Sequence, residues 1–111
     1  MSPFPLRARI GDGITVALDG PYATLVLGVS SPRAVLCLSP HEQDRLRMLM
    51  EAGRPCDEIL DPDEDDRDRV RCIQSPGLLT LVQDGAEAVV ARGPHAREAL
   101  LEILRANTFG I

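Results

Sequence analysis

The sequence predicts an α+β fold: a mostly antiparallel sheet of about six strands with two helices, built from two similar repeats that each run strand, strand, strand, helix. Apolar residues recur at helical spacing in two segments, and short runs of β-prone residues bounded by turn residues precede each segment. Segregated strands and helices of this kind are typical of the α+β class. The length of 111 residues fits a single domain over residues 1–111.

Three strands are predicted in the first half of the chain. Residues 14–18 alternate long apolar side chains with Thr and Ala, which indicates a half-buried strand that turns at residues 19–21 (Asp-Gly-Pro). Residues 23–29 and 35–38 are apolar at almost every position, as expected for strands covered on both faces.

Both helices have start signals. In the first, Ser39 supplies an N-cap hydroxyl, Pro40 takes the first helical position and Glu42 stands three residues after the cap, which together predict a capping box. Apolar residues then recur at helical spacing until a glycine and a proline follow, so a helix is predicted over residues 40–52. The second helix is predicted over about residues 94–107.

A short internal sequence repeat relates the two halves of the chain. Residues 34–41 (AVLCLSPH) match residues 88–95 (AVVARGPH), and a helical pattern follows each segment at the same offset. Three further strands are predicted in the second half, over residues 70–74, 78–82 and 87–91. The shared order indicates a duplicated unit, with repeat 1 over about residues 14–52 and repeat 2 over about residues 70–107.

A run of eight carboxylates between residues 57 and 68 separates the repeats. Because like charges repel, residues 53–69 are predicted to form a solvated, mobile linker. Three of the aspartates have the spacing that opens an EF-hand calcium loop, but the glycine and the final glutamate of that loop are missing, so no calcium site is predicted. The run is either a spacer or an electrostatic docking surface for a basic protein. The candidate docking residues are Asp61, Asp63, Glu64, Asp65, Asp66 and Asp68.

No catalytic, cofactor-binding or metal-binding residue is predicted, and we expect neither a cofactor nor an enzymatic activity. Cys37, Cys56 and Cys72 are an odd number of widely spaced thiols, which are expected to be reduced and free. Together with His41 they lack the close ligand pairs that mark zinc sites. His41 and His95 stand at equivalent places near the helix starts, where the helix dipole disfavours a charged imidazole, so both are interpreted as surface residues.

The composition limits the classes of partner. Twelve arginines and no lysine stand against 17 acidic residues, for a net charge of -5, and no surface is visibly prepared to bind phosphates. With no Trp, one Tyr and two Phe, side chains that stack on unpaired bases are scarce, and nucleic-acid binding is disfavoured. No apolar stretch approaches the ~20 residues that cross a bilayer. We therefore expect a cytoplasmic protein that does not contact a membrane.

The helical segments carry more apolar side chains than one narrow stripe needs. Methionine-rich surfaces adapt readily to partners, and two-fold pairs are the commonest assemblies. A homodimer is therefore predicted, with a dimer or partner face on the helices. The residues of this face are Leu46, Met48, Leu49, Met50 and Leu101.

Residues 24–50 contain a strand, a polar turn, a second strand, the Ser39-Pro40 cap and an amphipathic helix, and in this they resemble the small actinobacterial BldB-type family of developmental proteins. That resemblance implies a homo-oligomeric regulatory protein that works beside a helix-turn-helix regulator without enzymatic activity. The repeated layout is also similar to that of PUR-type and whirly-type single-strand binders, which use a sheet face as a platform. We expect a small regulatory or adaptor protein that acts by protein contact. The alternatives are single-stranded nucleic-acid binding and an antitoxin or immunity role.

Overall fold

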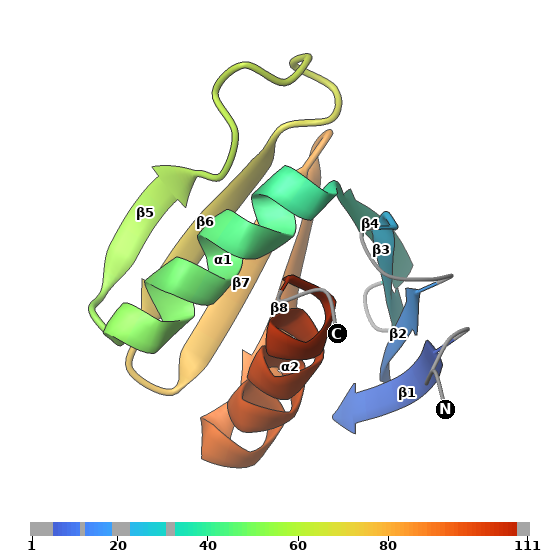
Figure 1. The fold of residues 1–111 in the computed structure, drawn as a ribbon, viewed down its shortest axis with the longest axis vertical. Helices are drawn as coiled ribbons and strands as arrows, with labels where there is room; N and C mark the ends of the chain where they lie inside the picture. Colours follow the sequence, from blue (N-terminus) through green and yellow to red (C-terminus); the bar gives the residue numbers. More distant parts are fainter. Residues whose placement is uncertain (1–5, 12, 19–22, 31–32, 109–111) are drawn as a thin grey trace.

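The computed structural model describes residues 6–11, 13–18, 23–30 and 33–108 of the chain. Within these residues there are eight strands and two helices, and each half of the chain has four strands followed by one helix (Figure 1). In chain order the elements are β1 (Leu6–Gly11), β2 (Ile14–Leu18), β3 (Leu25–Ser30), β4 (Arg33–Leu38), α1 (Pro40–Ala52), β5 (Cys56–Ile59), β6 (Val70–Ser75), β7 (Leu78–Gln83), β8 (Ala86–Arg92) and α2 (Gly93–Thr108).

The strands form two antiparallel four-stranded sheets. Sheet A has the order β1-β2-β3-β4, and sheet B has the order β5-β6-β7-β8. The α+β class is therefore confirmed, while the predicted single sheet of about six strands and the three-strand repeat are wrong. Local patterns predict which segments are extended, but pairing between strands depends on packing far along the chain.

The two sheets and the two helices share one apolar core. In Figure 1 α1 lies over sheet B, and α2 lies at β8, where it also contacts β1 of sheet A. Strand β8 itself contacts β1, β3 and β4 of sheet A. Leucines supply most of the large side chains that are fully buried. Neither described helix is long and apolar enough to span a membrane. The largest buried apolar side chains are Leu25, Leu27, Leu36, Leu38, Leu46, Met50, Leu79, Leu81, Leu100 and Leu104.

Helix α1 begins and ends at the predicted residues. The backbone N–H of Glu42 donates to Ser39 Oγ at 3.2 Å, and the backbone N–H of Ser39 donates to Glu42 Oε1 at 3.0 Å, which completes the capping box. At the other end, Gly53 adopts a left-handed φ of 69°, and its N–H donates to the carbonyls of Leu49 and Met50. The same short signals that predicted the helix therefore position the Glu42 carboxyl.

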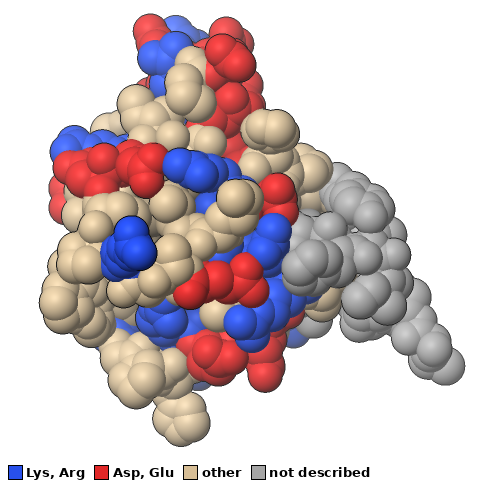
Figure 2. All heavy atoms as spheres, turned by 60° about the vertical axis from the view of Figure 1, so that its left-hand side comes forward, with Lys and Arg blue, Asp and Glu red and all other residues tan. Residues whose placement is uncertain are grey.

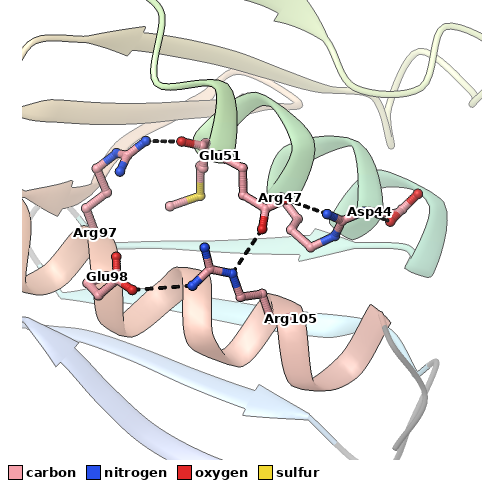
Figure 3. A network of polar contacts seen from close by, with 7 residues as sticks. Asp44, Arg47, Glu51, Arg97, Glu98 and Arg105 are labelled. Carbon is pink, nitrogen blue, oxygen red and sulfur yellow. Dashed lines mark hydrogen bonds and ion pairs between the residues drawn. The ribbon is translucent and has the colours of Figure 1, made fainter.

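A polar network fastens α1 to α2, and with it the first half of the chain to the second (Figure 3). Arg97 of α2 donates to the carbonyl oxygen of Met50 in the last turn of α1. Glu51 accepts from Arg47 of its own helix and from Arg105 of α2, the latter at 3.0 Å. The Arg105 and Arg47 guanidinium groups hold the pKa of Glu51 below its usual value.

Two strands were not predicted from the sequence. Residues 6–11 form β1, so the first repeat begins before residue 14. Residues 56–59 form β5, so the segment 53–69 is not a linker throughout. The turn predicted at residues 19–21 lies outside the described residues.

Candidate functional site

The acidic run divides into a neutralised part and a free part. Its first two carboxylates lie on β5 and face arginines: Asp57 forms a two-pronged ion pair with Arg71, with N–O distances of 2.5 and 2.6 Å, and Glu58 pairs with Arg45 of α1 at 2.8 Å. The Arg71 guanidinium lowers the pKa of Asp57. These two acids are used within the fold, so the candidate docking surface begins after β5.

Residues 61–69, called the acidic loop below, fold into consecutive turns held by their own hydrogen bonds. The Asp61 carbonyl accepts from the backbone N–H of Glu64 at 3.2 Å, and the Asp65 carbonyl accepts from the N–H groups of Asp68 and Arg69 at 2.9 Å each. The Nε of Arg69 also donates to the Glu64 carbonyl at 2.9 Å. Preceding the loop, Leu60 is buried in the core. The loop therefore has a defined shape and is anchored at its start.

The charge of the acidic loop is largely uncompensated. Six carboxylates stand against Arg67 and Arg69, for a net charge of -4. Among the described residues, one ion pair involves a carboxylate of the loop, between Asp66 and Arg69 at 2.7 Å. Figure 2 shows carboxylates gathered at the end of the molecule that this loop forms. All six predicted docking residues lie on this loop, which brings them together at one end of the fold.

Gln83, at the end of β7, ties the loop to both sheets. Its Oε1 accepts from the backbone N–H of Cys37 on β4, and its Nε2 donates to the carbonyl oxygens of Cys37 and of Asp68, all at 2.8 Å. One side chain thus provides hydrogen-bond partners for the backbone N–H and carbonyl of Cys37 on edge strand β4 and for the carbonyl of Asp68 in the acidic loop. The sequence offered no signal for this role, because glutamine at a strand end is a common surface residue.

A cleft of about 180 Å³ lies between the acidic loop and the start of α1, and Glu42, Glu64, Asp68 and Gln83 are among its lining residues. Glu42 is 1% exposed, and its Oε2 has no hydrogen-bond partner within the described chain. Burial raises the pKa of Glu42, the hydrogen bonds from Ser39 oppose the rise, and the charge of Glu64 adds to it. The buried Glu42 carboxyl therefore keeps its proton to a higher pH than a solvated glutamate does.

The substitution Glu42→Gln tests this environment. Glutamine retains the capping-box acceptor and removes the penalty of burying a carboxylate charge, so we expect the variant to be more stable than wild type by about 1 kcal/mol at pH 8. The folded-state pKa of Glu42 lies above its unfolded value of 4.5, so the wild type loses stability as the pH rises from 4.5 through the folded pKa. The glutamine of the variant does not titrate, so the variant lacks this loss. Urea unfolding at several pH values should show that the difference in unfolding free energy between variant and wild type becomes smaller toward pH 4. A difference that does not vary with pH would contradict a raised pKa of Glu42.

Most residues of the dimer face predicted on the helices are buried in the core of the chain itself. Leu46 and Met50 are buried at 0% and 1% exposure, and Leu101 at 3%, because all three point into the core. Leu49 is partly buried against the same core, and Met48 is exposed. The helices carry more apolar side chains than a single sheet would cover because they pack against two sheets, where only one had been predicted.

The cysteines and histidines do not assemble into a site among the described residues, where no group of three His, Cys, Asp or Glu side chains is placed to hold a metal ion. Cys37 lies exposed on β4, while burial raises the pKa of Cys72 to about 12 and keeps it a neutral thiol. His41 and His95 are both exposed. Comparisons of the chain with protein-family models, curated proteins and solved structures gave no match.

Proposed function

We propose that the chain is a small regulatory or adaptor protein that acts by protein–protein contact, and that its acidic loop is the docking surface for a basic partner. One observation supports this above the others: the loop is held in a defined shape while five of its six carboxylates make no ion pair with a described residue. A spacer needs neither property.

The chemistry of the loop points to the class of partner. Closely placed carboxylates accelerate encounter with a positively charged surface, and this attraction weakens as salt screens it. A basic DNA-binding face, such as that of a helix-turn-helix regulator, has the complementary charge. The BldB-type resemblance implies a partner of the same class and stays a prediction. A homodimer also stays a prediction, and it would have to use a surface other than the buried helix residues.

The test compares two variants that change the net charge equally. The triple variant D63N/D65N/D68N neutralises loop carboxylates whose side chains make no hydrogen bond within the described chain. The control E87Q/E98Q/E102Q neutralises three exposed acids elsewhere, of which Glu98 forms an exposed ion pair with Arg105 at 3.4 Å that contributes little to stability. Immobilised wild type should retain a basic protein from cells of the source organism at about 100 mM salt. The purified partner should then bind the loop variant at least ~10-fold more weakly than the control, by calorimetry.

Equal affinities of the two triple variants would contradict the proposal, because the interaction would then follow net charge alone. An affinity insensitive to salt would also contradict it. If the purified partner is a toxin or nuclease, the antitoxin or immunity alternative gains support over transcriptional regulation.

A further inference from the structure

The outer face of sheet A gathers arginines. Arg7 and Arg9 on β1 and Arg33 on β4 are exposed on the side of the sheet that faces away from the core. Among the described residues of β1 to β4, these three are the charged side chains, and no described carboxylate lies on these strands. None of the three makes an ion pair with a described residue, whereas Arg45, Arg47, Arg69, Arg71 and Arg105 all do.

Small residues between these arginines leave the face open. The strand register places Arg9, Thr15, Gly28 and Val35 in one row across the sheet. A hollow of about 430 Å³ is lined by Arg9, Arg33 and the hydroxyl-bearing Thr15, together with Gly28 of β3. A second hollow of about 370 Å³ continues along β1 and shares Arg9 and Thr15 with the first.

Glycine keeps the first hollow accessible. A Cβ at Gly28 would lie 3.0 Å from Thr15 Oγ1 and would crowd that hydroxyl. Gly13 has a φ of +72°, and a Cβ there would lie 2.2 Å from Ser30 Oγ, so the β1–β2 turn accepts no larger residue without displacing Ser30. The hollow therefore offers two guanidinium groups and two hydroxyl groups around Gly28, with the exposed side chain of Val35 beside them.

We propose that this arginine face, defined by Arg7, Arg9, Thr15, Gly28, Ser30 and Arg33, binds the phosphate backbone of a single-stranded nucleic acid. Guanidinium groups bind phosphate oxygens through paired hydrogen bonds, and hydroxyl groups complete the coordination. Arg7 and Arg9 are two residues apart on β1, about 7 Å, and Arg33 lies on β4 at the opposite edge of the sheet, so the charges are spread across the face. Separated charges suit a chain of phosphates better than a single phosphate group.

The mode of recognition follows from what else the face offers. Contacts to phosphate oxygens carry no sequence information, so binding through these arginines should be independent of the base sequence. Composition alone disfavoured nucleic acid because arginines are outnumbered by acids. The fold separates the two, with the carboxylates of the acidic loop at one end and, on sheet A, arginines that form no ion pair with a described residue.

Fluorescence anisotropy with a labelled oligothymidylate of about 12 nucleotides tests the proposal. Three phosphate contacts predict a slope of about -2 for log Kobs against log salt concentration. Each of Arg9→Gln and Arg33→Gln should weaken binding several-fold and reduce the steepness of this slope by about 0.7. Arg54→Gln, which removes an exposed arginine outside the face, should leave both values unchanged. All these variants change exposed residues, so thermal unfolding should match wild type.

A variant without a charge change separates the hollow from general attraction. Gly28→Leu fills the floor and should weaken binding as much as the loss of one arginine, and unaltered binding would overturn the assigned hollow. The proposal as a whole is overturned if R9Q/R33Q binds like wild type, or if R54Q loses as much affinity as R9Q. It is also overturned if a phosphorylated peptide of equal charge binds more tightly than the oligonucleotide.

Discussion

Replacing Gln43 with leucine should lower the free energy of unfolding by about 3 kcal/mol. Gln43 is fully buried on α1, and its Nε2 donates to the carbonyl oxygens of Ala23 and Leu38 at 2.8 and 2.9 Å. One amide thus joins the helix to the segment that precedes β3 and to the end of β4. Leucine has a similar size but no donor, so both carbonyls would stay buried without this partner. Urea denaturation of the purified variant measures the loss.

The control for Gln43→Leu is Met48→Leu on the same helix, where an exposed side chain is exchanged for another apolar one within about 0.5 kcal/mol. A Gln43→Leu variant as stable as this control would show that the two hydrogen bonds give no net stabilisation. A larger loss than expected, accompanied by a lower denaturant dependence, would indicate that the order of β3 and β4 depends on Gln43.

Helix α1 shows which features of a helix can be predicted from local sequence. Its bounds follow from chemistry within a few residues, namely the capping box of Ser39 and Glu42 and the left-handed Gly53, and both ends are confirmed. Which side of α1 is buried was predicted less well. Glu42 and Gln43 continue the buried stripe that leads to Leu46 and Met50, but polar residues there suggest a surface unless their hydrogen-bond partners on other strands are known.

Strand β5 was not predicted because the residues that pair with its acids lie far along the chain. Asp57 and Glu58 belong to a run of acids that predicts a solvated segment, yet Arg71 on β6 and Arg45 on α1 neutralise them. These arginines lie 14 and 13 residues away, so no local pattern shows the pairing. Likewise, the acidic residues of the loop are contiguous in the sequence, but the turns that give the loop a shape, and the position of the arginines on sheet A, come from tertiary structure.

Replacing Gln83 with methionine should reduce both stability and partner binding. Methionine keeps the length of the side chain but removes all three hydrogen bonds to Cys37 and Asp68. Because Gln83 is half-buried, water can replace part of what is lost, and we expect a cost of about 2 kcal/mol in unfolding free energy. The acidic loop also loses its attachment to β7, so hydrogen exchange of its backbone amides should increase.

Val82→Met is the matched control, since Val82 neighbours Gln83 on β7 but forms no bridge to the loop. If the loop binds its partner because it is held in shape, Gln83→Met should weaken binding by about 10-fold at unchanged net charge, and the control should not. Faster exchange in the loop with undiminished affinity would mean that charge alone suffices for docking. Binding that falls without faster exchange would instead place Gln83 in the contact surface, beside the Glu42 cleft that it lines.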